Sequence, residues 1–476
     1  MTRPHVVVVG GGLAGLSAAL HCADGGARVT VVERRRRLGG LTWSFDHDGR
    51  SVDNGQHVFL RCCHAYLGFL ERIGSADDVT LQDRLDITVI RPATAPQSRS
   101  AHRDSGTGRR CQARITRNNL PAPAHLAASL LAYRLLPLVD RARLARAVLP
   151  LRHLDLHDPT LDDQTFGAWL AAHGQSARAI TALWDLITVA TVNLPAAEAS
   201  LAMGAKVFQT GLLTDAGSAD IGWSKIPLGV LHGQRAAAAL HRAGAEVAYG
   251  ELVVRIEPAG PAPTHRPGGG FAVRTDARTL DADAVVVALP HHAVGAVLPA
   301  GTVAYQDRLG ELGTSPIVDV HLTYDRTVTD LPLMAGVGTP LQWLFDRTAS
   351  SGLEPGSAQY LAVSLSAAEA AMGRHPDDLV AEAARELPLV LPAAAGARLI
   401  SSLVTKERTA TFRAVPGTAR LRAPARTAIP GLWLAGAWTD TGWPATMEGA
   451  CRSGRAAGRG ALLDADRAHR LHEEVA

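Results

Sequence analysis

Apolar residues along the chain follow two spacings, one typical of buried strands and the other of helices. Val6 to Val9 form a β-branched run of the kind found in strands buried on both faces. Leu13 to Leu20 contain good helix formers, and Val29 to Val32 form a second apolar run. The N-terminal part of the chain therefore predicts a β-α-β unit of a parallel sheet.

The strand pattern returns further along the chain. Runs of the same apolar character occupy 246–249, 253–256, 271–274, 284–290 and 431–436. We expect a helix over 236–240 before the first of them and a helix over 449–462 after the last. The Pro- and Gly-rich residues from Pro258 to Gly270 predict a hairpin tip. These runs are expected to rejoin the sheet that the first unit begins.

Two long intervening segments have a different character. Residues 123–154 and 160–213 place apolar residues at helical spacing, and a helix is also expected over 59–73. Residues 93–112 are rich in Ser, Arg, Gly, Thr and Pro and predict a surface loop. Strands are expected over 85–92, 113–116, 317–322 and 342–345.

These elements predict a fold of the α/β plus α+β class. A discontinuous, doubly wound Rossmann-type domain is assigned to residues 1–82, 226–296 and 426–465. An inserted substrate-binding domain of mixed sheet and helices is assigned to 83–225 and 297–425, and 466–476 are predicted to form a C-terminal tail. At 476 residues the chain is long enough for two to three domains with separate cores.

The turn after Val9 carries candidate chemistry. Gly10, Gly12 and Gly15 have the Gly-x-Gly-x-x-Gly spacing where a strand feeds a helix. The first glycine permits a tight turn, the second lets a pyrophosphate approach the backbone, and the third allows close packing of helix on strand. The N–H groups of Leu13 and Ala14 then face the phosphates. Glu33, at the end of the second run, stands where an acid binds a ribose hydroxyl.

Other interpretations of this stretch remain open. Arg3 followed by an apolar run resembles a secretory signal, but four glycines interrupt the run and Glu33 is left unexplained. The turn could also bind no ligand, or belong to a nicotinamide-dependent dehydrogenase. We find no second Gly-x-Gly-x-x-Gly after a strand, which favours one extended cofactor, FAD, held from both ends of the chain.

The amino-acid composition excludes several other classes of protein. The chain is 47% hydrophobic and 20% charged, with 48 basic and 45 acidic residues, so its charge of +3 gives no reason to expect a nucleic-acid partner. No apolar run is long enough to span a bilayer. Five cysteines without Cys-x-x-Cys spacing predict neither a disulfide framework nor a metal site. We therefore expect a cytoplasmic protein.

Two more segments are candidates for the site. Arg34, next to Glu33, is a candidate nucleotide contact, whereas the following arginines are typical of a solvated face. Gly39 and Gly40 form a second place where the backbone can approach a cofactor. The polar segment from Asp53 to Val58 lies between apolar runs, which is typical either of a functional site or of an Asx-type turn with a satisfied histidine.

Several of these motifs together resemble the flavin amine oxidase and phytoene desaturase superfamily, and within it most closely the squalene-associated FAD-dependent desaturases, the hydroxysqualene dehydroxylases. The resemblance spans nearly the whole chain. Superfamily motifs are found at 10–15, Glu33, 39–40, 253–256 and 434–436. Blocks that resemble the subfamily are found at 53–58, 118–123, 315–322, 342–346, 406–412 and 438–450.

The resemblance implies FAD as cofactor and assigns its contacts. Gly10, Gly12 and Gly15 would hold the pyrophosphate, Glu33 the adenosine ribose, and Val253 the adenine. The resemblance also places Gly436 and Ala437 along the ribityl chain, and Thr446 and Met447 near the pyrimidine edge of the flavin. Two positions depart from the family pattern, which usually has arginine where this chain has Leu41 and an acid where it has Ala437. The second change removes a hydrogen bond of about 1 kcal/mol.

The implied activity is reductive dehydroxylation of hydroxysqualene to squalene for hopanoid or related triterpene synthesis. It requires hydride from reduced FAD, an unidentified electron donor, an apolar tunnel and a proton donor. Gln56 and His57 are the predicted catalytic pair, with Asp53, Asp440 and Glu448 as alternates. A carotenoid-type desaturase, an amine oxidase-like flavoenzyme and a nucleotide-binding module without activity are the alternatives.

The implied substrate also suggests where the protein works. A lipophilic substrate barely dissolves in water, so peripheral contact with the inner face of the cell membrane is expected through the helices of 123–154. The alternative is that the apolar residues of these helices pack into the core of the protein.

Overall fold

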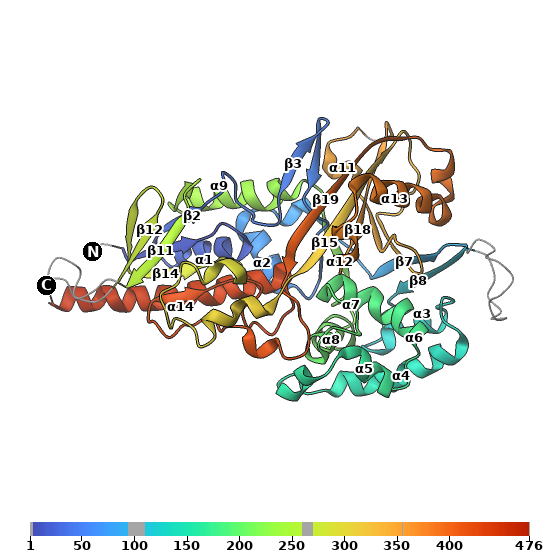
Figure 1. The fold of residues 1–476 in the computed structure, drawn as a ribbon, viewed down its shortest axis with the longest axis horizontal. Helices are drawn as coiled ribbons and strands as arrows, with labels where there is room; N and C mark the ends of the chain where they lie inside the picture. The colour runs from blue at the N-terminus through green and yellow to red at the C-terminus, as the bar shows by residue number, and fades with distance from the viewer. Residues whose placement is uncertain (1–2, 94–109, 259–269, 355, 476) are drawn as a thin grey trace.

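The computed structural model describes residues 3–93, 110–258, 270–354 and 356–475. Most of the predicted surface loop at 93–112 and of the hairpin tip at 258–270 lies outside the described residues. Figure 1 shows an elongated molecule in which a helix-covered sheet stands beside a second sheet and a cluster of helices.

The first sheet is parallel and buried on both faces. Its strand order is β10-β2-β1-β14-β20, and every neighbouring pair is parallel. Branched apolar residues fill β1 and β14 because no solvent reaches either face. The strands are β1 (His5–Val9), β2 (Arg28–Glu33), β10 (Glu246–Tyr249), β14 (Ala284–Val287) and β20 (Leu432–Leu434).

Different layers cover the two faces of this sheet. Val6, Val8 and Val31 pack with helices α1 (Leu13–Asp24), α2 (His64–Ile73), α9 (Arg235–Arg242) and α14 (Met447–Val475). Val7 and Val9 pack toward a separate antiparallel sheet. That sheet contains β11 (Val253–Pro258), β12 (Phe271–Thr275) and β13 (Thr279–Ala282). Two runs predicted to join the first sheet, 253–256 and 271–274, therefore form its cover instead.

The first and last helices of the chain lie side by side, as Figure 1 shows. A Cβ on Gly454 would come within 2.0 Å of the Ala14 carbonyl oxygen, so only glycine allows this approach. The Cys22 thiol donates to the Gly458 carbonyl oxygen at 3.3 Å. Helix α14 is longer than the predicted 449–462, and it continues through the segment predicted as a tail up to Val475.

The second large sheet has seven strands in the order β19-β15-β18-β17-β16-β7-β8. Neighbouring strands are antiparallel except for the parallel pair β16 and β7. The strands are β7 (Asp86–Arg91), β8 (Cys111–Thr116), β15 (Ser315–Tyr324), β16 (Leu333–Gly336), β17 (Trp343–Asp346), β18 (Gln359–Leu365) and β19 (Leu399–Thr411). Short helices and α13 accompany it: α10 (His291–Val294), α11 (Thr348–Ser351), α12 (Glu369–Met372) and α13 (Pro376–Val390).

A cluster of helices packs beside β7 and β8 around an aromatic core. Phe166, Trp184 and Phe208 have ring centroids within 5.8 Å of one another. Both segments predicted to be helical, 123–154 and 160–213, consist of several helices. The first is interrupted after Leu131, and the second contains the π-helical segment η4 (Ile180–Trp184). The helices of the cluster are α3 (Ala127–Leu131), α4 (Leu138–His153), α5 (Phe166–Ala172), α6 (Ala177–Ala179), α7 (Asp185–Val192) and α8 (Leu201–Phe208).

Two small sheets join the parts. β3 (Ser44–His47) and β4 (Arg50–Asp53) form a hairpin, and β5 (Val58–Leu60), β9 (Ile221–Ser224) and β6 (Val79–Leu81) form an antiparallel sheet. The prediction of a helix over 59–73 was wrong at its start, because Phe59 pairs with Gly222 in a strand and the helix begins only at His64.

The fold class predicted from the sequence is confirmed: a Rossmann-type parallel sheet with an inserted region of mixed sheet and helices. Each strand of the first sheet lies within 1–82, 226–296 or 426–465, and each strand of the second large sheet lies within 83–225 or 297–425. The division into two domains at those boundaries stays a prediction.

Candidate active site

The turn between β1 and α1 has the backbone that a pyrophosphate site needs. Gly10 has a φ of +103°, and a Cβ on Gly15 would lie 1.9 Å from the Gly10 carbonyl oxygen. Gly12 is the N-cap of α1, which has no side-chain cap and no acidic residue in its first turn. The N–H groups at Leu13 and Ala14 are therefore left for an anionic ligand, as a phosphate requires.

Glu33 lies beside this turn at the end of β2. Its buried carboxylate accepts hydrogen bonds from the N–H groups of Gly11, at 2.7 Å, and Arg35, at 2.8 Å. Each carboxylate oxygen has a second lone pair that can accept from a ribose hydroxyl. Arg34 is exposed, whereas Val253 is buried on β11. The nucleotide contacts proposed for Glu33, Arg34 and Val253 stay predictions.

A second glycine turn touches the first. The Gly39 N–H donates to the Gly11 carbonyl oxygen at 2.9 Å, and a Cβ on Gly40 would lie 2.9 Å from the Gly12 Cα. Leu41, which stands in place of the family's arginine, is partly exposed. Arg37 instead reaches this turn, donating to the Gly40 carbonyl oxygen at 3.0 Å. Burial lowers the pKa of Arg37 to about 10.

The loop from Gly436 to Met447 leads into α14. The Gly436 N–H donates to the Ser453 hydroxyl at 3.0 Å, and the Thr446 hydroxyl accepts from the Gly449 N–H at 3.2 Å. Ala437 and Met447 are half-buried. The loop therefore meets the N-terminal end of α14 where the resemblance places the ribityl chain and the flavin ring.

Arg422 holds the shape of this loop, a role that its position in the sequence does not reveal. Its buried guanidinium donates to the carbonyl oxygens of Trp438, Thr439 and Trp443 at 3.2, 2.6 and 2.7 Å. Burial lowers its pKa to about 10. The guanidinium of Arg422 thus provides hydrogen-bond donors for three carbonyl oxygens of a loop that has no regular secondary structure.

A buried ion pair anchors the polar segment predicted as a site. Asp53 accepts from Arg347 at 2.9 Å, from the Ser44 hydroxyl at 2.6 Å and from the Leu228 N–H at 2.9 Å. Only 6% of the Asp53 side chain and 7% of that of Arg347 are exposed. The carboxylate of Asp53 is thus fully engaged in holding three parts of the chain together.

Gln56 and His57 follow Asp53 closely in the chain. Asn54 donates its N–H to the carbonyl oxygen of Trp43, three residues beyond Gly40, at 2.8 Å. The Gln56 amide nitrogen is buried, and in the described part of the chain it has no hydrogen-bond partner. His57 Nδ1 lies 3.1 Å from the Gly55 carbonyl oxygen, and burial lowers the pKa of His57. The catalytic role of this pair stays a prediction.

Asp319, which the sequence analysis did not select, lies against the same segment. It occupies the middle of β15 and is 2% exposed. Its Oδ1 has no hydrogen-bond partner among the described residues, while the Ser364 side chain and the Gln56 backbone hydrogen bond to its carboxylate. Burial raises the pKa of Asp319 to about 7. An acidic residue within a strand of otherwise apolar inward positions is the sequence signal that could have identified it.

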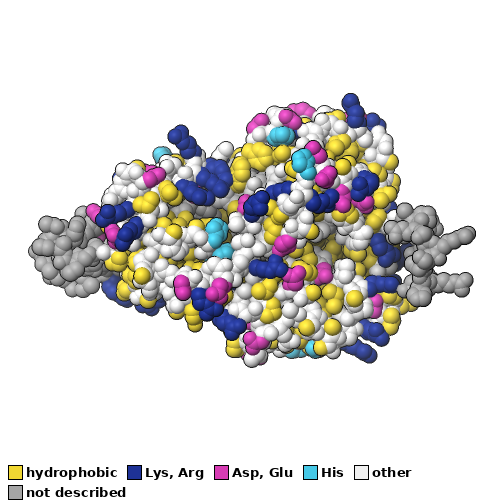
Figure 2. Space-filling model, in the orientation of Figure 1, with side chains coloured by type: hydrophobic (Ala, Val, Ile, Leu, Met, Phe, Trp, Pro, Cys, Tyr) yellow, Lys and Arg dark blue, Asp and Glu magenta, His cyan; other side chains and the backbone are white. Residues whose placement is uncertain are grey.

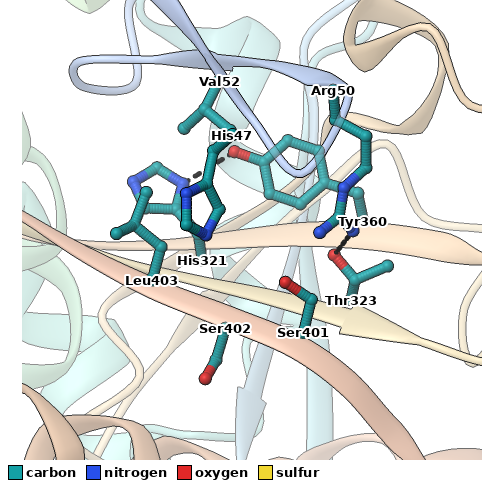
Figure 3. Close-up of a pocket in the computed structure, with 9 residues that line it drawn as sticks. All are labelled: His47, Arg50, Val52, His321, Thr323, Tyr360, Ser401, Ser402 and Leu403. Carbon is teal, nitrogen blue, oxygen red and sulfur yellow. Dashed lines mark hydrogen bonds between the residues drawn. The ribbon is translucent and has the colours of Figure 1, made fainter.

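The neighbouring polar face of β15 is shown in Figure 3. His321 bonds to the Tyr360 hydroxyl at 2.7 Å and to the Thr405 hydroxyl at 3.1 Å, and Arg50 donates to Thr323 at 2.5 Å. His321, Tyr360, Arg50 and Thr323 line a cavity of about 10 Å³, which is room for one water molecule. Burial lowers the pKa of His321 to about 3, so it is neutral at physiological pH.

The other two acidic residues named as catalytic alternates, Glu448 and Asp440, lie in different surroundings from Gln56 and His57. Glu448 is buried and accepts from the N–H groups of Ala65 and Tyr66 and from Arg452. Asp440 is exposed and lines an open cleft of about 440 Å³ together with arginines of α14. Neither acid shares hydrogen bonds with Gln56 or His57 in the described structure.

The residues fit FAD. Two glycine turns in contact, an uncapped helix start and a buried acid at the end of the neighbouring strand form a cradle at the carboxyl ends of parallel strands, where dinucleotides bind. Among the described residues, no group of His, Cys, Asp and Glu is arranged to hold a metal ion.

Comparison with known proteins agrees with this geometry. The hydroxysqualene dehydroxylase of Rhodopseudomonas palustris is 27% identical over 471 residues, which cover 95% of this chain and 97% of that protein. The chloroplastic zeta-carotene desaturase of Zea mays is 24% identical, covering 94% of this chain and 82% of that protein. The solved structure of cyclohexylamine oxidase from Brevibacterium oxydans IH-35A has a TM-score of 0.69 at 19% identity, covering 98% of this chain and 100% of that one.

A family model described as flavin containing amine oxidoreductase matches residues 13–462. The match includes Glu33 and the loop from Gly436 to Met447, so it covers most of the predicted cofactor site. The resemblance to this superfamily is therefore confirmed, and so is FAD as the cofactor. The chain belongs to the flavin containing amine oxidoreductase family and is an FAD-dependent oxidoreductase.

Proposed function

We propose that the protein reduces hydroxysqualene to squalene, removing the hydroxyl group as water, in hopanoid or related triterpene synthesis. Support comes from the near full-length likeness to the hydroxysqualene dehydroxylase of Rhodopseudomonas palustris. The observation that carries the proposal is the buried Gln56 amide nitrogen, which has no hydrogen-bond partner in the described part of the chain. Such a donor is suited to a substrate that brings a single hydroxyl group to an otherwise apolar site.

The chain's own residues would orient this hydroxyl. When bound and reduced, FAD supplies hydride. Gln56 donates a hydrogen bond to the substrate oxygen, and His57, kept neutral by burial, contacts the same group. The substrate tunnel and the electron donor that reduces FAD stay predictions.

The test is single turnover in the absence of oxygen. Purified protein with photoreduced FAD is mixed with hydroxysqualene, and squalene is measured by mass spectrometry. We expect squalene in amounts matching the reduced flavin, and lower turnover in Gln56→Leu and His57→Ala with FAD content unchanged. Failure to form squalene from reduced enzyme would refute the proposal.

A carotenoid-type desaturase is the second candidate, favoured by the likeness to the zeta-carotene desaturase of Zea mays. Such an enzyme would use oxidised FAD and form a double bond. Incubating oxidised protein with phytoene or zeta-carotene, and recording the absorbance of longer conjugated products, separates the two reactions. Assaying primary amines tests the amine oxidase alternative.

We also propose that α3 and α4 contact a membrane surface from which a lipophilic substrate is taken up. Leu131 and Leu138 are 63% and 75% exposed, and Val139 is 54% exposed. Exposed arginines, including Arg134 and Arg143, lie among them, and Figure 2 shows hydrophobic and basic side chains on the same face of the molecule. Apolar residues with interspersed basic ones are typical of interfacial helices. None of the helices in the described residues has the length and apolar content that crossing a bilayer requires.

Sedimentation with liposomes tests this contact. Wild-type protein is expected to bind vesicles containing anionic lipid, and Leu131→Ser combined with Leu138→Ser is expected to reduce binding severalfold. Leu463→Ser is a matched control, because Leu463 is 56% exposed on α14, away from these helices. Equal binding of wild type and the double variant would contradict the proposal.

A further inference from the structure

We propose that Asp319 is the acid that protonates the departing hydroxyl group of the substrate. This inference rests on the proposed dehydroxylation and adds the proton donor that the reaction needs. It stands on where the carboxyl group lies, on what it bonds and on the engagement of the other acids near the site.

Asp319 projects from the polar face of a strand whose other face is core. Val318 and Val320 on either side of it pack into the apolar cluster under α13. Because side chains alternate along a strand, Asp319 points the opposite way, on the same side of β15 as His321 and Thr323. That side of β15 meets the β3–β4 hairpin, where Arg50 donates to Thr323, and it meets Gly55, which lies against Asp319.

One oxygen of the Asp319 carboxyl group, Oδ1, has no hydrogen-bond partner among the described residues. The Ser364 hydroxyl and the Gln56 N–H hydrogen bond to the carboxylate, but Oδ1 has no partner among the described residues although it is buried. A Cβ on Gly55 would lie 3.4 Å from Oδ2, so the neighbouring residue has no side chain to cover the group. Gln56 Nε2 and Asp319 Oδ1 are both buried and without partners among the described residues, and Gly55, the residue before Gln56, lies against the Asp319 carboxylate. A buried polar atom normally has a partner, so the pair indicates a place for a ligand's polar group.

The other acids near the site are not available for this task. Asp53 is bound to Arg347, Ser44 and the Leu228 N–H. Glu448 accepts from two N–H groups at the start of α2 and from Arg452. The carboxylates of Asp53 and Glu448 already accept hydrogen bonds from these protein donors, whereas Asp319 Oδ1 has no partner among the described residues.

The charges around Asp319 favour its protonated form. Burial and the negative charge of Asp53 both raise its pKa, to about 7. The facing groups are the Asp53–Arg347 pair from β4 and the end of β17, His57, His321 on β15 itself and Tyr360 on β18. Burial lowers the pKa of both histidines, so they are neutral and do not stabilise a carboxylate by charge.

The proposed step balances as follows. The carbon–oxygen bond of the substrate breaks, and hydride from reduced FAD forms a carbon–hydrogen bond at the same carbon. The Asp319 carboxyl proton joins the leaving oxygen, which departs as water, and the carboxylate later takes a proton from solvent. The substrate gains two electrons and the flavin loses two. Gln56 hydrogen bonds to the same oxygen and holds it toward Asp319.

The first test compares wild type with Asp319→Asn, which keeps the shape but carries no acidic proton. We expect the rate of squalene formation from hydroxysqualene to fall by about 10² to 10⁴-fold. An activated substrate, the acetate ester of hydroxysqualene, needs no strong acid at its leaving group, so the variant should regain most of its rate on it. Asp330→Asn, at an exposed aspartate, is the control. Unchanged FAD content shows that the variants fold.

The second test does not depend on turnover. Infrared difference spectra of the protein without substrate should show one protonated carboxyl group that titrates near pH 7 in wild type and is missing in Asp319→Asn. A wild type that forms no squalene overturns the proposed function whatever the spectra show. An active wild type whose rate is unchanged by Asp319→Asn, or a titrating carboxyl signal that persists in that variant, overturns only the role of Asp319.

Discussion

The buried carboxyl of Asp319 predicts an unusual dependence of stability on pH. In the folded protein its pKa is raised to about 7, against 3.8 in the unfolded chain. Between these values the folded state binds the proton more tightly than the unfolded state does. The stability contributed by this group is therefore fully present below about pH 4 and is lost as pH rises through about 7. Asp319→Asn removes the titration.

The magnitude follows from the two pKa values. Their difference is about 3 pH units, and each unit corresponds to 1.36 kcal/mol, so ionisation of Asp319 costs the folded protein about 4 kcal/mol. Between about pH 5 and about pH 8 the loss is about 3 kcal/mol. The Asn variant should gain this amount relative to wild type over that range, since its amide never ionises.

Urea unfolding followed by tryptophan fluorescence measures the effect. The free energy of unfolding of FAD-loaded wild type, Asp319→Asn and the control Asp330→Asn is determined at about pH 5 and about pH 8. We expect the stability of Asp319→Asn relative to wild type to rise with pH, and that of Asp330→Asn to stay constant. If wild type and Asp319→Asn lose stability in parallel, the carboxyl titrates normally and the reasoning fails.

Three further changes test the cofactor cradle and its anchor. Gly15→Ala places a Cβ against the Gly10 carbonyl oxygen and should abolish flavin absorbance in the purified protein, whereas Gly68→Ala, with open space around it, should keep full FAD content. Arg347→Ala leaves Asp53 buried without its partner and should lower the free energy of unfolding by about 3–5 kcal/mol in urea. Ala437→Asp should restore a ribityl hydrogen bond and lower the FAD dissociation constant about fivefold by fluorescence titration, corresponding to about 1 kcal/mol; unchanged affinity would place Ala437 away from the cofactor.

Much of the first sheet and of the cofactor class could be predicted because the signals are local. The apolar run from Val6 to Val9 indicates a buried strand. The glycines that follow it form a turn in which Gly15 packs against Gly10, only five residues away. The wrong start of the helix over 59–73 shows the limit. Phe59 is equally compatible with helix and strand, and it became a strand because it pairs with Gly222, far along the chain.

The candidate site shows the same division. The sequence by itself determined the glycine turns, Glu33 and the polar segment at Gln56 and His57, since each is a short pattern with its own chemistry. Only the tertiary structure decided which acidic side chains are buried and which of them are paired. Burial and pairing are set by contacts between distant segments: Arg347 reaches Asp53 across 294 positions, and β15 brings Asp319 against Gln56. A pKa depends on those surroundings, so no pattern along the chain reveals it.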